Sequence, residues 1–238
     1  MNLFKLTDGK LNQLDREKFP LERDIQRLVE ENLSEVFNLQ FVASELSVDQ
    51  FRFDTLAFDE ETNSFVVIEY KKGNSYSVVD QGYSYLSVML NNKADFILEY
   101  NERMEQNLRR NDVEWSSSRV IFVSQNFNTY QKNSVNFRDI PFELWEIRRF
   151  ADNVVSLSRH QANSTEDINL VSSASEDSTI KQVSAEIKVY DEADHTFGAS
   201  EELLATWEKL KEDLTSWDDV DCYTTKHYVG FKRGGVVF

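Results

Sequence analysis

An acid and a base follow directly from an apolar run at residues 64–72, which read SFVVIEYKK. The run has the composition of a buried strand, and Glu69 and Lys71 continue it without a turn signal. Because strand side chains alternate between faces, Glu69 and Lys71 share one side of the strand. A carboxylate and an amine that leave a core together are candidates for chemistry on a polar substrate.

A second carboxylate, Asp54, is predicted to lie opposite Glu69. The two strand-like segments around it are joined by the polar turn 59–63. If the hairpin turns about the middle of this segment, Asp54 faces Glu69, whereas a one-residue slip in register would separate them. The sequence therefore predicts Asp54, Glu69 and Lys71 at one end of an otherwise apolar hairpin.

Two chemical interpretations of this cluster are open. Two neighbouring carboxylates repel each other, so either one of them takes up a proton or a cation lies between them. Mg²⁺ prefers oxygen ligands and commonly binds one or two carboxylates while keeping waters and substrate oxygens, and Lys71 could then position or deprotonate the attacking water. The alternative is a cross-strand or solvated ion pair, which is the more frequent meaning of this spacing taken alone.

Helices and strands alternate around the hairpin. Apolar side chains at helical intervals after Pro20, with acids in the first turn, predict an amphipathic helix at 21–37. Further helices are expected at 78–89 and 101–112. Expected strands are 41–46, 51–58, 64–71, 96–100, 119–124 and 142–147. This order predicts an α/β fold with a central mixed β-sheet flanked by helices.

A polar segment divides the chain into two predicted units. Residues 158–187 are rich in Ser, Asn, Asp and Glu with little periodicity, which predicts a linker. It would separate a first domain, 1–157, from a small C-terminal α+β domain, 188–238. A helix near 200–210 and a strand at 227–232 are expected in the second domain. The second domain is short, and we expect it to be incomplete.

Charge and composition restrict the partners. The net charge of −16 repels nucleic acid at long range, although a basic groove or a bound metal can override it locally. Residues 1–160 carry 19 Lys and Arg against 26 Asp and Glu, whereas residues 161–238 carry 7 against 16. The first segment should therefore repel a polyanion less strongly than the second. The single cysteine, Cys222, suits a reducing compartment. Without an apolar run of about 18 residues or a signal-peptide core, the expected location is the cytoplasm, with no membrane partner.

The spacing of Asp54, fourteen intervening residues and Glu69-Tyr70-Lys71, in helix–strand–strand–strand–helix order, resembles the PD-(D/E)XK (restriction-endonuclease-like) nuclease superfamily. The sequence QGYSY at 81–85 also resembles the Q-x-x-x-Y motif of some exonuclease branches. The resemblance covers roughly residues 15–150, with Phe53 where the motif name has proline. The C-terminal unit is similar to a small domain that accompanies such nuclease-like domains in bacterial proteins labelled "predicted transport protein".

This resemblance implies a role for each matching residue. Asp54 and Glu69 would bind Mg²⁺ or Mn²⁺ with help from the main-chain carbonyl of Tyr70, and Lys71 would be catalytic. The remaining matches would support the site: Glu22 as the acid of the first helix, with Glu31 a weaker candidate, and Gln81 and Tyr85 as substrate-binding residues. Lys72, in the following loop, is a further candidate for a phosphate contact, although a solvated loop lysine is commoner.

The expected activity is therefore Mg²⁺-dependent hydrolysis of DNA, as an (endo)deoxyribonuclease. The alternative is a binding protein with the same fold but no catalytic activity, a regulatory module whose acidic C-terminal domain recruits a protein partner. A homodimer is also possible. A transport accessory role has only the family label behind it. The arginine pairs 109–110 and 148–149 could line a DNA path, or they could be ordinary surface charges.

Overall fold

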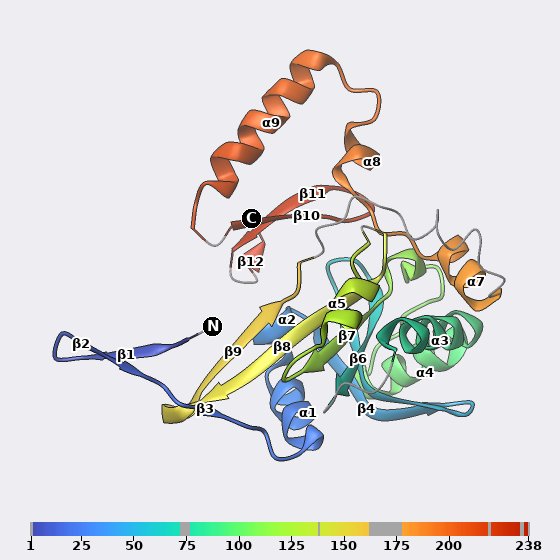
Figure 1. Cartoon of the computed structure of the whole chain (residues 1–238). Coiled ribbons are helices and arrows are strands. Elements are labelled where there is room, and N and C mark those ends of the chain that lie inside the picture. The colour runs from blue at the N-terminus through green and yellow to red at the C-terminus, as the bar shows by residue number, and fades with distance from the viewer. Residues whose placement is uncertain are drawn as a thin grey trace.

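A central β-sheet organises the computed structural model, which describes residues 2–71, 77–137, 139–161, 178–218, 220–233 and 236–237. Its strand order is β3-β8-β7-β6-β5-β4, with β9 also paired to β8 (Figure 1). The strands of this sheet are β3 (Arg16–Glu17), β4 (Gln40–Val48), β5 (Phe51–Asp59), β6 (Ser64–Lys71), β7 (Arg119–Ser124), β8 (Phe142–Phe150) and β9 (Val154–Arg159).

The sheet is mixed, as the sequence predicts. Strands β4, β5 and β6 form an antiparallel meander, β6, β7 and β8 run parallel, and β3 and β9 are antiparallel to β8. Because β6 belongs to both the meander and the parallel part, its carboxyl end lies where the two kinds of pairing meet. The predicted α/β fold class is confirmed.

Helices cover both faces of this sheet (Figure 1). Helices α1 (Glu22–Glu31) and α2 (Leu33–Phe37) pack on one face, over an apolar cluster that includes Ile25, Val29 and Ile68. Helices α3 (Val78–Asn91), α4 (Lys93–Met104) and α7 (Ser178–Glu186) pack on the other face, over a larger cluster, and the short α5 (Thr129–Ser134) contacts α3. The helices therefore bury the sheet from both sides, which fixes the strand ends.

The helix predicted at 21–37 is two helices. The side-chain amide of Asn32 donates to the carbonyl of Leu28 at 2.8 Å, and its backbone N–H bonds to the carbonyl of Val29. Asparagine side chains form local hydrogen bonds with the backbone that compete with the helical ones. The first helix therefore ends before Asn32, and α2 begins at Leu33. The N-terminal helix, with Glu22 in its first turn, is nevertheless in the predicted position.

The strand predicted at 96–100 is wrong, because these residues lie inside α4. Phe96 and Tyr100, four apart, are buried, whereas Leu98 is 56 % exposed. A short apolar run does not distinguish a strand from a buried helix by periodicity, and here the helical spacing holds. The helix predicted at 101–112 is wrong beyond Met104, where α4 ends, because residues 105–112 form no helix.

Part of the predicted linker is also structured. Its last residues form α7, and Val183 and Ile187 are buried in the same apolar cluster as the sheet and α3. Two well-spaced apolar side chains therefore suffice to dock a helix whose composition is otherwise polar. Residues 162–177 of the predicted linker lie outside the described residues, and the domain boundaries stay a prediction.

Two small elements flank the main sheet (Figure 1). An N-terminal hairpin consists of β1 (Phe4–Thr7) and β2 (Lys10–Gln13). The C-terminal unit combines α8 (Glu192–Thr196) and α9 (Glu201–Thr215) with a three-stranded sheet of β10 (Val220–Thr224), β11 (Val229–Arg233) and β12 (Val236–Val237). The helix and the strand expected in this unit are confirmed. Within the described part of the chain, no helix is both long and apolar enough to span a bilayer.

Candidate active site

The hairpin has the register that its sequence predicts. Thr55 pairs with Ile68, and the ladder continues to Asp59 and Ser64 beside the turn. The ladder stops before Asp54, whose carboxylate oxygen Oδ2 instead accepts a hydrogen bond of 3.0 Å from the backbone N–H of Tyr70. The carboxylate of Asp54 is thereby fixed beside β6, at the residue that follows Glu69.

Glu69 is the centre of a hydrogen-bonded group between β6 and α3. It is buried, and its Oε1 accepts from Lys71 Nζ at 2.9 Å and from Gln81 Nε2 at 2.7 Å. Its Oε2 accepts from the hydroxyl of Tyr85 at 2.9 Å. Gln81 and Tyr85 lie four residues apart on α3, so they share a helix face. The structure thus brings the E-x-K triplet and the Q-x-x-x-Y sequence into one contact network.

Burial, followed by the negative charge of Glu69, raises the pKa of Asp54 to about 7. The N–H of Tyr70 acts in the opposite direction, whereas the charges of Glu45 and Glu22 raise this pKa further. Near neutral pH the site therefore opposes full ionisation of Asp54. A proton or a cation relieves this repulsion, as expected for two carboxylates that share a site.

The donor atoms fit a hard divalent ion. Asp54 and Glu69 supply carboxylate oxygens, and among the described residues Oδ1 of Asp54 accepts no hydrogen bond. No group of three or more His, Cys, Asp or Glu side chains in the described ranges could hold a metal ion. Two carboxylates with main-chain, water and substrate oxygens are a common set for Mg²⁺, whereas zinc sites typically include Cys or His ligands. The roles of Asp54, Glu69 and the Tyr70 carbonyl as ligands stay predictions.

Glu22 lies in the first turn of α1, near enough to raise the pKa of Asp54. The weaker candidate, Glu31, is exposed at the other end of the same helix. Of these two candidates, the first-turn acid is the one whose charge acts on Asp54, while a third acid of the helix, Glu30, accepts a hydrogen bond from Thr55 of β5. Lys72, predicted to contact phosphate, lies outside the described residues.

Gln26 is a supporting residue that the sequence interpretation missed. It is buried one turn after Glu22, and its Nε2 lies 3.0 Å from the main-chain carbonyl of Asp54 and 3.1 Å from both Ser44 Oγ and Glu30 Oε1. It ties α1 to the strand that carries Asp54. The available signal was a polar side chain next to Ile25 on the apolar face of an amphipathic helix.

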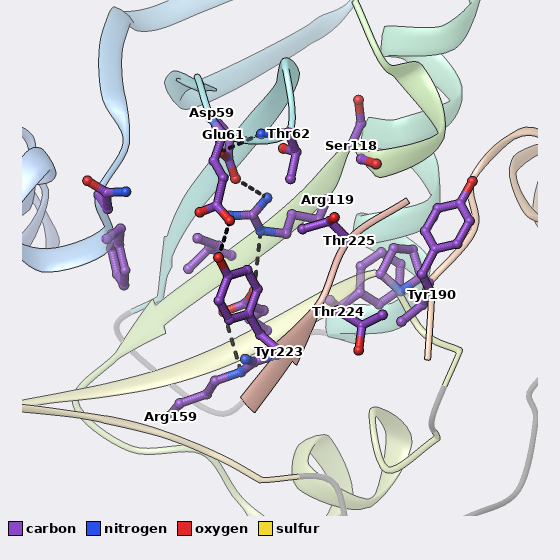
Figure 2. A pocket seen from close by; sticks show the side chains of 18 of the residues that line it. Asp59, Glu61, Thr62, Ser118, Arg119, Arg159, Tyr190, Tyr223, Thr224 and Thr225 are labelled. Carbon is purple, nitrogen blue, oxygen red and sulfur yellow. Dashed lines mark hydrogen bonds and ion pairs between the residues drawn. The ribbon is translucent and has the colours of Figure 1, made fainter. Parts of the chain in front are cut away.

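A cavity of about 1060 Å³ lies at the opposite end of the sheet, between the starts of β7 and β8 and the C-terminal unit (Figure 2). Arg119 bonds there to Asp59 at 2.8 Å and lies 3.3 Å from Glu143. Tyr223 donates to Glu61 in the hairpin turn. The bond from Tyr223 joins the C-terminal unit to the turn, at the other end of β5 and β6 from Asp54 and Glu69, so the cavity is not part of the candidate active site.

The described geometry defines a mixed-sheet α/β protein with a carboxylate-rich site at one strand end. The chain belongs to the same family as an uncharacterised protein of Haemophilus influenzae, to which it is 45 % identical over 235 residues, 98 % of this chain and 77 % of the relative. No family model matches the chain.

Similar solved structures include EndoMS in a complex with double-stranded DNA, at 18 % identity and a TM-score of 0.34 over 56 % of this chain and 48 % of that one. A repair endonuclease from Pyrococcus abyssi has 17 % identity and a TM-score of 0.28, over 51 % and 45 % of the two chains. SfsA of Pyrococcus furiosus in complex with Ca²⁺ has 10 % identity and a TM-score of 0.29, over 65 % and 68 %. The chain thus spans about half the length of the first two, and this distant likeness assigns it no activity.

Proposed function

We propose that this chain is a metal-dependent nuclease that hydrolyses phosphodiester bonds in DNA. One observation carries the proposal: Asp54, Glu69 and Lys71 lie together at the end of the hairpin, where Gln81 and Tyr85 of α3 hold Glu69. A half-buried acid with a raised pKa beside a second acid and a lysine is typical of a functional site. A purely structural ion pair between Glu69 and Lys71 would need neither Asp54 nor the two donors from α3.

Each residue has a role that its contacts support. A divalent ion at Asp54, Glu69 and the Tyr70 carbonyl would supply an activated water and neutralise charge on the phosphate. The ammonium of Lys71, largely buried beside these acids, would orient the attacking water or stabilise negative charge that develops on the phosphate oxygens. Gln81 and Tyr85 would fix the Glu69 carboxylate in position, because each donates a hydrogen bond to it.

The direct test is cleavage of supercoiled plasmid and linear duplex DNA in the presence of Mg²⁺ or Mn²⁺. Nicking of the closed plasmid would identify endonuclease action. Lys71→Ala is expected to lower the rate by about 10²-fold or more, as for loss of a group that acts on a proton in the transition state. Asp54→Asn and Glu69→Gln should abolish the dependence of the rate on metal concentration.

Glu102→Gln is the matched control, since it removes a carboxylate of α4 that is exposed to solvent. Its rate should equal that of the wild type. Cleavage that persists in both Asp54→Asn and Lys71→Ala at the wild-type rate would eliminate the mechanism and indicate a contaminating nuclease.

A binding module without catalysis is the second candidate, and the surface of the C-terminal unit favours it. Leu203 and Leu210, seven residues apart on α9, are 59 % and 48 % exposed, and Trp217 beyond the helix is 56 % exposed. Exposed apolar side chains in an acidic segment are a feature of protein-binding surfaces. Isothermal titration with Mn²⁺ separates the two proposals, because a silent module needs no ion at Asp54, whereas light scattering tests for a homodimer.

A further inference from the structure

A cation of helix α5 and a cation of strand β8 share a single buried carboxylate, Glu146 of β8. Lys132 Nζ of α5 lies 2.7 Å from its Oε1, and Arg148, two residues along β8, bonds to its Oε2. The backbone N–H of Phe127 also donates to Oε1, at 3.3 Å. Burial alone would raise the pKa of Glu146, but Lys132, the N–H of Phe127 and Arg148 together hold it below its ordinary value, so the glutamate stays ionised.

This group lies on the same face and at the same end of the sheet as the candidate active site. Lys71 of β6 is level with Ser124 of β7, which is level with Glu146. Glu69 and Lys71 face α3, as does Glu146, because Leu144, two residues earlier on β8, belongs to the α3-side cluster. Adjacent strands are about 4.8 Å apart, so Glu146 lies about 10 Å from Lys71 across the sheet.

Lys132 and Arg148 carry more positive charge than is needed to neutralise Glu146. Two cations neutralise one carboxylate, which leaves a net charge of about +1 at this edge. The side chain of Lys132 is 33 % exposed and that of Arg148 is 19 % exposed, so both cations reach solvent. A guanidinium has five N–H donors, and those not bound to Glu146 are available to a second acceptor. In a chain of net charge −16, an excess of cations beside the candidate site is a local exception.

We propose that Lys132 and Arg148 form a phosphate-binding subsite, which holds the backbone of the nucleic-acid strand about 10 Å from Lys71, on the β8 side. The inference rests on the proposed function, since it assigns the path of the same substrate. Glu146 orients the two cations so that less conformational freedom is lost when the strand binds. The subsite contacts phosphate and carries no information about base sequence.

The test measures binding separately from cleavage, by fluorescence anisotropy of a labelled DNA duplex with Ca²⁺ in place of Mg²⁺. Lys132→Gln and Arg148→Gln are each expected to weaken binding equally for unrelated DNA sequences. Each should also reduce the slope of log affinity against log salt concentration by about 0.9, the contribution of one phosphate contact. Lys132→Arg, which keeps the charge, should retain the wild-type slope.

Lys209→Gln is the matched control. Lys209 is exposed on α9 of the C-terminal unit, and Tyr223 of this unit bonds to Glu61 in the hairpin turn. The substitution removes one positive charge from the unit at the turn end of the sheet, and its salt slope should equal that of the wild type. If Arg148→Gln does not fold, Lys132→Gln alone decides, because Lys132 is the more exposed partner and its removal leaves Glu146 paired with Arg148.

Each outcome bears on one proposal or on both. Wild-type slopes in Lys132→Gln and Arg148→Gln would overturn the subsite, even if the wild type cleaves DNA. If both variants have reduced salt slopes but the wild type does not cleave DNA, the result would support the subsite and contradict the proposed catalytic activity. An equal reduction of the salt slope in these variants and in Lys209→Gln would show a general charge effect and overturn the subsite. A wild type that binds no DNA would overturn both proposals.

Discussion

Asp54→Asn should stabilise the metal-free protein. The pKa of this carboxyl is 3.8 ordinarily and about 7 in the folded protein, mainly because of burial and then the charge of Glu69. Folding therefore favours the protonated form, so the stability associated with Asp54 is complete below about pH 4 and is lost as the pH rises through about 7. Each pH unit between the two pKa values corresponds to about 1.4 kcal/mol, which gives an upper limit of about 4 kcal/mol.

Asparagine removes the charge but keeps an oxygen that can accept from the N–H of Tyr70. In EDTA at about pH 8, the free energy of unfolding of Asp54→Asn should exceed that of the wild type by about 2–4 kcal/mol. The gap should grow by about 2 kcal/mol between about pH 5.5 and about pH 8. Urea denaturation at several pH values, followed by circular dichroism, measures it.

Divalent ions should reverse the order of stability of the wild type and Asp54→Asn. Mg²⁺ or Mn²⁺ should raise the stability of the wild type at about pH 8 and leave that of Asp54→Asn unchanged, because only the carboxylate gains from the ion. Asp213→Asn, an exposed aspartate of α9, is the matched control and should stay within about 0.5 kcal/mol of the wild type at every pH. A variant less stable than the wild type at pH 8, or a gap that does not change with pH, would refute the assignment of a repulsive, partly buried pair.

Three further substitutions probe the support of the site. Gln26→Leu leaves the carbonyl of Asp54 without its donor, so stability should fall by about 1–3 kcal/mol and affinity for Mn²⁺, measured by calorimetry, should fall with it. Tyr85→Phe removes one of the three donors to Glu69, and cleavage should slow with little loss of stability, as measured by kinetics and thermal melting in parallel. Gly82→Ala should lower stability by about 1–3 kcal/mol in a urea titration, because the added methyl would lie 2.5 Å from a phenylalanine ring of β8.

The hairpin shows what local sequence can predict. A short polar turn between two strand-like runs determines the register as far as Thr55 and Ile68, and one further residue along each strand gives Asp54 and Glu69. The spacing of Gln81 and Tyr85 likewise predicts that they share a face of α3, although it does not predict that this face contacts Glu69. Such pairings follow from periods of two and of about 3.6 residues, which need no knowledge of distant parts of the chain.

Contacts between distant segments are harder to predict. Gln26 bonds to the carbonyl of Asp54, and any residue type offers such a carbonyl, so no residue pattern marks the partner. The residues around Phe96 fit a strand and a buried helix equally well until the packing of α4 against the sheet decides. For α7, two apolar positions in a polar segment become informative only when α3 supplies the surface that buries them.

The point at which β5 leaves β6 is the physical origin of the candidate site. Had the antiparallel ladder continued past Thr55, a main-chain carbonyl would be the natural partner of the Tyr70 N–H, and the Asp54 side chain would be free to rotate away. Because the ladder stops, the N–H of Tyr70 donates to a carboxylate oxygen of Asp54 instead. This bond holds Asp54 near Glu69 although the two negative charges repel each other. The N–H of Tyr70 on β6 therefore offsets part of the repulsion between the two carboxylates, and Gln26 of α1 holds the main chain of Asp54 in place, while the rest of the repulsion leaves the pKa of Asp54 raised.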